Sequence, residues 1–231
     1  MGLRQFTLDL GPEPDQRFER FIEGANGLLL AHLLGLRPGD APTLLSGAAG
    51  SGKTHLLRAL GALWQAQGLV VQAFDAATMA PWTLSAQARL VLLDDVDRFD
   101  ADQQQAAFGL FIEAVGQGAA VVAASRLPAA ELSLREDLRT RLAWGPGFAL
   151  QPLGDAALRQ LLRDEGAHRG LLLPDELLDH LLLRFERDTN HLLPLLQQLD
   201  RYAMRTKRAP SVPLLREMLM NERDATTTDP V

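Results

Sequence analysis

Short apolar runs alternate with helical patterns through the first 150 residues of the chain. Apolar runs rich in Leu, Val and Ala are typical of buried strands, whereas apolar residues three and four positions apart indicate helices with one buried face. We expect strands at 42–46, 69–75, 90–93, 119–124 and 148–150, and helices at 28–36, after residue 53, at 103–115 and at 131–141. Strands that alternate with helices predict an α/β fold with a parallel five-stranded sheet flanked by helices.

From Gln151 onward the strands stop and only helical patterns follow. We expect helices at 155–168, 174–185, 189–205 and 212–220. Leucines recur at helical spacing at positions 177, 178, 181, 182, 192, 195, 196 and 199. This pattern favours the core of a small all-α domain over a zipper or a cofactor site. Residues 224–231 have no apolar anchor and are expected to be disordered.

The helix over 103–115 shows how a pattern assigns the buried face. Its apolar stripe is expected at Ala107, Phe108, Phe111, Ile112 and Val115. The glycines at 116 and 118 are expected to end this helix.

A glycine-rich loop follows the first strand and precedes a helix with Leu56, Leu57, Leu60 and Leu63 on one face. Gly47-Ala48-Ala49-Gly50-Ser51-Gly52-Lys53-Thr54 fits the phosphate-binding P-loop pattern in the strand–loop–helix context that this pattern requires. The backbone N–H groups of such a loop and the helix N-terminus favour an anion. Lys53 is expected to reach the β- and γ-phosphates, and the Thr54 hydroxyl to bind Mg²⁺. A glycine-rich turn that only caps a helix is the alternative.

Two acids end the strand over 90–93, about 40 residues after the P-loop. A buried strand would carry Asp94 to the carboxyl edge of the sheet, where its carboxylate holds the Mg²⁺ water shell. Asp95 is then placed to activate water. Without the P-loop, an acidic turn would be the simpler interpretation.

Three further segments carry candidate binding residues. Phe21 and Ile22 precede the P-loop strand, and they could wall a nucleotide base or pack as plain core. Ser125-Arg126-Leu127-Pro128 follows the fourth strand and puts a polar residue beside the expected γ-phosphate position. Residues 5–10, Gln-Phe-Thr-Leu-Asp-Leu, fit an edge strand or an extended peptide that docks in a partner's groove, and composition alone favours the strand.

Composition narrows the class of protein without naming an activity. The chain of 231 residues has 47% hydrophobic residues, a net charge of −6 and no cysteine. These values predict a globular protein without disulfides or a cysteine-based zinc site, and they argue against a general DNA-coating protein. No apolar run is long enough to span a membrane, and the N-terminus lacks the layout of a signal peptide, so the expected location is cytoplasmic.

The P-loop, the acidic strand end and the arginines before the fifth strand resemble the AAA+ ATPases. The segments Gly52-Lys53-Thr54-His55-Leu56-Leu57, Leu93-Asp94-Asp95-Val96, Arg141-Leu142-Ala143-Trp144-Gly145 and Leu195-Leu196-Gln197-Gln198-Leu199-Asp200 are similar to the DnaA-related family. The resemblance covers residues 3–220, and it is greatest to short members that lack the C-terminal DNA-binding helix-turn-helix. The chain is expected to end where that domain would begin.

The resemblance implies a division of the chain and a set of roles. It implies an N-terminal clamp-binding peptide and hinge (1–12), an AAA+ nucleotide-binding base (13–152), an α-helical lid (153–222) and a disordered tail (223–231). Gln5, Phe6, Leu8, Asp9 and Leu10 become the clamp-binding residues, which reverses the preference for an edge strand. Arg141 becomes an arginine finger that acts on a neighbour's nucleotide, and a helix-end arginine with a favourable dipole contact is the alternative.

The nucleotide-binding residues implied by the pattern include one departure from the family. They are Gly47, Gly50, Ser51, Gly52, Lys53, Thr54, His55, Phe21, Ile22 and Asn190, with Thr54 and Asp94 at the Mg²⁺ ion and Asp95 catalytic. Asn190 stands where the lid normally has an arginine that senses the γ-phosphate. Ser125 stands where the family usually has an aspartate before Arg-Pro-Pro. Both changes predict weak self-hydrolysis, with ADP or ATP held as a structural latch.

Three functions fit these residues. The first is a negative regulator of replication initiation, which uses the sliding clamp (the DNA polymerase III β subunit) and stimulates hydrolysis of DnaA-bound ATP. It would contact DNA only indirectly or weakly, and its self-association is left open. The second is a stand-alone AAA+ ATPase such as a helicase loader. The third is a divergent DNA-binding initiator, which the acidic pI of about 5.4 disfavours.

Overall fold

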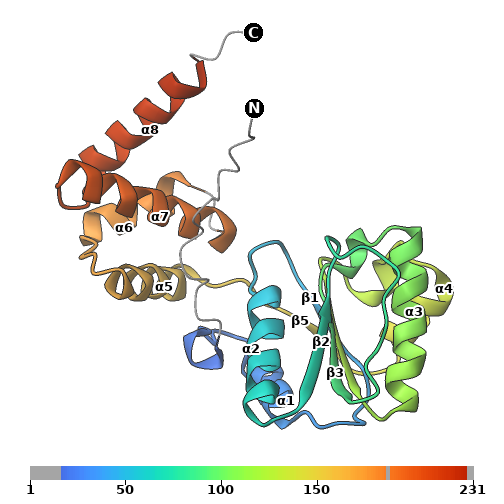
Figure 1. The fold of residues 1–231 in the computed structure, drawn as a ribbon. Coiled ribbons are helices and arrows are strands. Elements are labelled where there is room, and N and C mark those ends of the chain that lie inside the picture. Colours follow the sequence, from blue (N-terminus) through green and yellow to red (C-terminus); the bar gives the residue numbers. More distant parts are fainter. Residues whose placement is uncertain (1–16, 186–187, 228–231) are drawn as a thin grey trace, which may run out of the picture.

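A computed structural model describes residues 17–185 and 188–227, apart from the side chains of Asn190 and of residues 222–227. Figure 1 shows two lobes, a sheet flanked by helices and a group of helices formed by the C-terminal part of the chain. The sheet order is β2-β3-β4-β1-β5, and all its neighbours pair in parallel. The strands are β1 (Thr43–Ser46), β2 (Val70–Phe74), β3 (Ala88–Leu93), β4 (Ala120–Ser125) and β5 (Gly147–Ala149). The predicted α/β fold is confirmed.

Helices cover both faces of this sheet. One face carries α1 (Gly27–Gly35) and α2 (Lys53–Ala66), and the other carries α3 (Ala101–Gly116) and α4 (Glu136–Leu142) (Figure 1). Three short 3₁₀ turns, η1 (Phe18–Arg20), η2 (Val96–Arg98) and η3 (Ala129–Glu131), complete the lobe.

The strand side chains alternate between the two faces, as the pleat of a strand requires. Leu90 and Leu92 of β3 pack in the core under α1 and α2, whereas Val91 and Leu93 pack in the core under α3 and α4. Burial on both faces explains why these strands appear in the sequence as continuous apolar runs.

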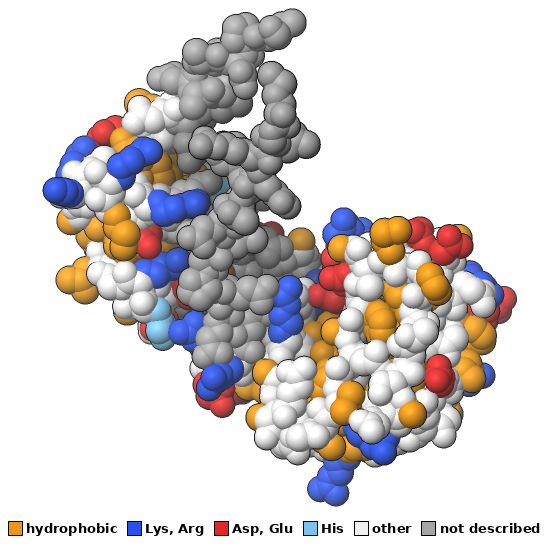
Figure 2. Space-filling view, viewed as in Figure 1, with side chains coloured by type: hydrophobic (Ala, Val, Ile, Leu, Met, Phe, Trp, Pro, Cys, Tyr) orange, Lys and Arg blue, Asp and Glu red, His pale blue; other side chains and the backbone are white. Residues whose placement is uncertain are grey.

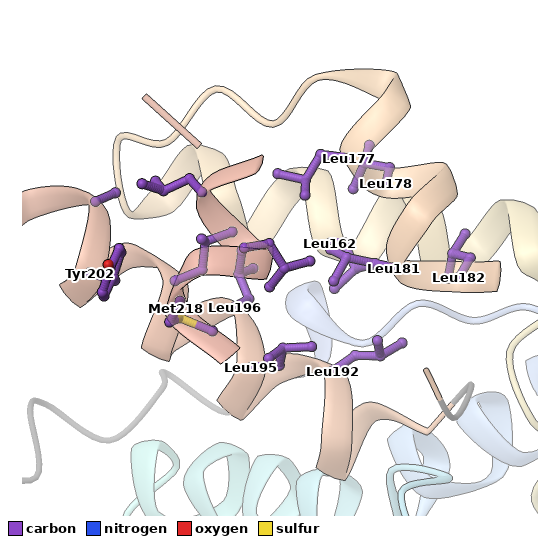
Figure 3. Close-up of a cluster of buried hydrophobic side chains, with 14 of the residues drawn as sticks. Leu162, Leu177, Leu178, Leu181, Leu182, Leu192, Leu195, Leu196, Tyr202 and Met218 are labelled. Atoms are coloured by element: carbon purple, nitrogen blue, oxygen red, sulfur yellow. The ribbon is translucent and has the colours of Figure 1, made fainter. Parts of the chain in front are cut away.

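The helical lobe consists of α5 (Asp155–His168), α6 (Asp175–Arg184), α7 (Thr189–Thr206) and α8 (Val212–Thr227). The eight leucines predicted as its core are all buried in one cluster, which Tyr202 and Met218 join (Figure 3). The predicted bundle core is therefore confirmed. Among the described residues, no helix combines the length and the apolarity needed to cross a bilayer.

The structure differs from the predicted elements in three places. In α3 the buried residues are Gln103, Ala107, Leu110, Phe111 and Ala114, while Ile112 and Val115 are 45% and 41% exposed. The helix is apolar on most sides, so the pattern did not fix which side faces the sheet. The predicted helix at 131–141 is split into η3 and α4, because the Arg135 N–H donates to the Gln104 side chain at 3.0 Å instead of to an earlier turn.

The third difference concerns the end of the chain. Helix α8 continues to Thr227, beyond the predicted end at Met220 and into the segment predicted as disordered. The sequence has no Gly or Pro between Leu214 and Asp229, so nothing stops the helix before Pro230. Residues 228–231 lie outside the described part of the chain.

Candidate nucleotide site and outward arginine

The P-loop joins β1 to α2 at the carboxyl edge of the sheet. Gly52 has φ +99°, a left-handed conformation, and a Cβ atom there would lie 2.8 Å from the Phe21 ring. Glycine is therefore required both by the turn and by the close approach of Phe21. The N–H of Gly47 donates to the Ser125 carbonyl oxygen at 3.2 Å, which fixes the start of the loop to the end of β4.

Lys53 is the first residue of α2 and points back into the loop. Its Nζ donates to the carbonyl oxygens of Gly47 at 2.7 Å and Ala48 at 2.8 Å. The residue is 6% exposed. Burial lowers the Lys53 pKa, and the neighbouring carboxylates, Asp95 first, oppose this shift. A buried cation at the start of the helix that follows a glycine-rich loop fits the phosphates of a nucleotide.

Thr54 and Asp94 meet although they are 40 residues apart in the sequence. The Thr54 hydroxyl donates to Asp94 Oδ2 at 2.6 Å, and the Asp95 N–H donates to Asp94 Oδ1 at 3.0 Å. Burial raises the pKa of Asp94, and the hydrogen bond from Thr54 opposes this rise. A hydroxyl and a carboxylate in contact beside a phosphate loop fit the oxygen ligands that Mg²⁺ takes.

Asp95 lies in an unusual backbone conformation. It has φ 53° and ψ 42°, in the left-handed region that a non-glycine residue rarely adopts. Its carboxylate pairs with Arg98 at 3.2 Å, and both side chains line the same cavity as Lys53. The predicted catalytic acid is therefore at the phosphate side of the site, but it is engaged by a cation of its own chain.

Lys53, Thr54 and Asp95 line a cavity of about 550 Å³ between the two lobes, whereas Gly47 and Asp94 are not among its lining residues. Phe21 and Ile22 line it together with Gly50, Ser51, Gly52, Lys53, Thr54 and His55, so the structure brings most of the predicted nucleotide-binding residues together. The His55 ring lies 5.7 Å from the Phe21 ring, and its Nε2 donates to the Arg17 carbonyl oxygen at 2.9 Å.

Sequence reasoning missed several side chains of this cavity. From the sheet lobe they are Arg20, Arg98 and Arg126, and from the linker and the helical lobe they are Leu153, Leu161, Glu165, Thr189 and Leu193. The polar residue expected at the tip of β4 is a signal that could have found Arg126. The residues of the helical lobe depend on how the lobes meet, which no local pattern encodes.

The helical lobe touches the P-loop at the start of α7. The Thr189 hydroxyl donates to the Gly50 carbonyl oxygen at 2.5 Å. The Asp188 carboxylate lies so close to Gly50 that a Cβ atom there would overlap it. Asn190 follows in the first turn of α7, and its side chain lies outside the described part of the structure.

Arg141 is separated from this cavity. It is exposed in the last turn of α4, and its Cζ lies 5.9 Å from the centre of the Trp144 ring. A second cavity, of about 380 Å³, is lined by Phe108, Asp137, Thr140, Arg141 and Trp144. None of these residues lines the P-loop cavity, so the guanidinium faces solvent rather than its own chain's phosphate loop. The predicted clamp-binding residues 5–10 lie outside the described residues.

The surface charge is unevenly distributed. On the face shown in Figure 2, Lys and Arg side chains are most frequent over the helical lobe, whereas hydrophobic side chains are scattered over the sheet lobe. Trp144, at 62% exposed, is among the large apolar side chains that the sheet lobe presents to solvent.

Comparison with known proteins identifies the relatives of this chain. The family described as Hda, lid domain, matches residues 155–219. An uncharacterized protein of Haemophilus influenzae is 30% identical over 228 residues, which cover 94% of this chain and 98% of that protein.

Solved structures show the same fold. Domain III of the replication initiation protein DnaA from Thermotoga maritima matches with a TM-score of 0.77 and 21% identity, over 91% of this chain and 98% of that one. AMPPCP-bound DnaA from Aquifex aeolicus matches with a TM-score of 0.63 and 21% identity, over 80% of this chain and 65% of that one.

Proposed function

The chain belongs to the DnaA-related, Hda-like family of AAA+ proteins, and from this premise we propose that it is a negative regulator of bacterial chromosomal replication initiation. In this proposal the protein acts in the cytoplasm on DnaA that has bound ATP. It is recruited by the DNA-loaded sliding clamp through residues 5–10, and it stimulates hydrolysis of the ATP on DnaA. The base at 13–152 and the lid at 153–222 hold its own nucleotide.

The position of Arg141 carries the proposal. Its side chain is exposed at the end of a helix and lies outside the cavity of its own P-loop. A guanidinium so placed can reach a neighbouring molecule's phosphates, where it neutralises the charge that grows as the phosphoryl group is transferred. Arginine fingers supplied in trans accelerate such reactions by about 10³–10⁵-fold.

The chain's own nucleotide is the second part of the proposal. Lys53 and the P-loop N–H groups hold the phosphates of ADP or ATP, while Thr54 and Asp94 hold Mg²⁺. Phe21 and Ile22 offer an apolar wall for the base. The fit of these groups supports the assignment, as does the binding of AMPPCP by DnaA of the same fold. When bound, the nucleotide with its Mg²⁺ would supply the negative charge that the buried Lys53 balances.

A stand-alone ATPase is the second candidate, and the place of Asp95 in the P-loop cavity favours it. The pairing of Asp95 with Arg98 weighs against it, since an engaged carboxylate is a poorer partner for water. Initial rates of ATP hydrolysis by the purified protein separate the two functions. Substantial turnover without DnaA supports the ATPase.

Reconstituted hydrolysis of DnaA-bound ATP, with clamp loaded on DNA, tests the first proposal. The wild-type protein should accelerate hydrolysis, and Arg141→Ala should remove the acceleration. Arg139→Ala is the matched control, because Arg139 also lies in the last turn of α4 but does not line the second cavity. If Arg141→Ala accelerates hydrolysis as much as the wild type does, the proposal is contradicted.

A further inference from the structure

Among the residues that the structure describes, the cations that line the P-loop cavity come from the sheet lobe. Lys53, Arg20, Arg98 and Arg126 line it from that side. The described lining residues of the helical lobe are Leu161, Glu165, Thr189 and Leu193, and none of them carries a positive charge. The lobe adds the Asp188 carboxylate beside Gly50. Among the described residues, a terminal phosphate held here would therefore meet positive charge from the sheet side alone.

The sheet order places Arg126 at the phosphate end of the cavity. Strand β4 lies between β1, which leads into the P-loop, and β3, which leads to Asp94. Ser125, the last residue of β4, accepts the hydrogen bond from the Gly47 N–H through its carbonyl oxygen. The next residue is Arg126, so its side chain leaves the sheet between the P-loop and the Mg²⁺-binding pair.

A buried carboxylate orients Arg126. Asp97 Oδ1 accepts from the Arg126 backbone N–H at 3.0 Å, and Asp97 Oδ2 accepts from Arg126 Nε at 2.6 Å. The Asp97 side chain is 7% exposed, whereas that of Arg126 is 56% exposed. Within the described residues, the two terminal guanidinium nitrogens of Arg126 have no hydrogen-bond partner. Asp97 thus holds the Nε edge of the Arg126 guanidinium. The two terminal nitrogens, which are the donors suited to phosphate oxygens, stay available.

The other two arginines are less suitable. Arg98 uses one of its terminal nitrogens, Nη1, for Asp95 at 3.2 Å, whereas the ion pair of Arg126 with Asp97 engages Nε. Arg20 precedes Phe21, and it therefore lies at the apolar wall that suits a base.

We propose that Arg126 contacts the terminal phosphate of ATP in this chain's own site, and that it takes the part of the lid arginine whose position Asn190 occupies. The inference rests on the proposed binding of a nucleotide, but not on the proposed action of Arg141. It has a functional consequence: the distinction between ATP and ADP is made by the tip of β4 in the base. This distinction between ATP and ADP does not require a cation from the lid.

Affinity measurements with the purified full-length chain test this inference. The probes are AMPPCP and ADP, each with Mg²⁺, and binding is followed by calorimetry. Arg126→Gln should weaken AMPPCP binding by roughly tenfold to a hundredfold, as expected for lost charge-assisted hydrogen bonds. ADP binding should change by less than about threefold. Arg126→Lys keeps the positive charge but loses the paired terminal nitrogens of the guanidinium. Its affinity for AMPPCP should therefore lie between those of the wild type and Arg126→Gln.

Two control variants make the outcome specific. Arg208→Gln removes an arginine that is 50% exposed and bonded to Glu217 at 2.6 Å in the helical lobe, so it matches Arg126 in exposure and pairing. It should leave both affinities unchanged. Lys53→Gln should weaken both nucleotides. Thermal unfolding confirms that each variant is folded.

The results separate the inference from the proposed function. If the wild type binds neither nucleotide, the proposed nucleotide site is wrong and the inference falls with it. If the wild type binds both and Arg126→Gln lowers the two affinities equally, or lowers neither, only the role of Arg126 is overturned. Loss of stimulated hydrolysis on DnaA would depend on Arg141 and would not decide this question.

Discussion

The guanidinium of Arg141 lies over the indole ring of Trp144, with 5.9 Å between Cζ and the ring centre. The two side chains are linked through the backbone as well, because the Trp144 N–H donates to the Arg141 carbonyl oxygen at 3.2 Å. Leu138 and Leu142 bury the other side of α4 in the core. The arginine proposed to act on a neighbouring molecule is therefore held between a fixed helix and an aromatic surface.

Trp144→Ala should weaken the stimulation of DnaA-bound ATP hydrolysis without abolishing it. The contact between an arginine and an aromatic ring at an exposed site is worth about 0.5–1 kcal/mol, which corresponds to roughly two- to fivefold in rate. Trp144→Phe keeps a ring under the guanidinium and should retain most of the activity. The measurement is the reconstituted hydrolysis assay with the clamp on DNA. Equal losses in the alanine and phenylalanine variants would contradict a role for the ring.

Gly145→Ala should destabilise the protein. A Cβ atom at Gly145 would lie 1.9 Å from the Pro42 carbonyl oxygen, which is backbone and cannot move aside cheaply. The expected cost is about 1–3 kcal/mol in the free energy of unfolding, as for other overpacked sites. Urea denaturation measures it.

Gly109→Ala is the matched control for that substitution. Gly109 lies in the interior of α3, and a Cβ atom there meets nothing within 4 Å. Alanine should stabilise the helix by roughly 0.5–1 kcal/mol. If Gly145→Ala lowers the free energy of unfolding and Gly109→Ala raises it, the loss at Gly145 comes from the close approach of Pro42 and not from the substitution of glycine as such. That approach then fixes the turn that carries Trp144. Destabilisation by both would argue against this explanation.

The sequence predicts the site as far as its geometry is local. The P-loop pattern alone positions Gly52, Lys53 and Thr54, because loop and helix are contiguous. Asp94 could be placed because parallel strands end at one edge of the sheet. The same argument brings Arg126, the residue after β4, to this edge, but whether its side chain and that of Arg98 face the cavity depends on the turn that follows each strand. Asp97 decides the direction of Arg126, and nothing in the local sequence indicates that pairing.

The fold, like the site, was predictable where it depends on local sequence patterns. The strands and the helices of the C-terminal lobe follow from apolar runs and from leucine spacing. The orientation of α3 did not follow, because Ile112 and Val115, which are exposed, are as apolar as the residues that face the sheet. The start of α4 also did not follow, since it depends on the contact between the Arg135 N–H and the Gln104 side chain.

Gln5→Ala combined with Leu8→Ala should reduce the affinity for the sliding clamp by roughly tenfold or more. The proposed peptide docks in extended form, so loss of a polar and an apolar anchor removes two pocket contacts. A pull-down or surface-binding assay with isolated clamp measures this. Arg141→Ala is the control and should bind the clamp as the wild type does. Unchanged affinity of the double variant would remove residues 5–10 from the interface.

His55 should make the protein less stable in mildly acidic solution. Burial lowers its pKa below the ordinary value; the hydrogen bond to the Arg17 carbonyl oxygen opposes this, and the charge of Arg20 adds to it. Because the unfolded chain then binds a proton more readily than the folded protein, the free energy of unfolding rises with pH. The contribution of His55 is complete above its unfolded pKa of about 6.5. It is lost as the pH falls from there toward the lower folded pKa.

His55→Gln should therefore flatten the pH dependence of stability just below pH 6.5. Glutamine can still donate to the Arg17 carbonyl oxygen, but it does not titrate. Urea denaturation at several pH values between about 5.5 and 7.5 gives the slopes, and His168→Gln, in an exposed position of α5, is the control. The raised pKa of Asp94 acts in the opposite direction, but it is shared by wild type and variants and cancels in the comparison. Parallel slopes for His55→Gln and the wild type would show that His55 does not couple protonation to folding.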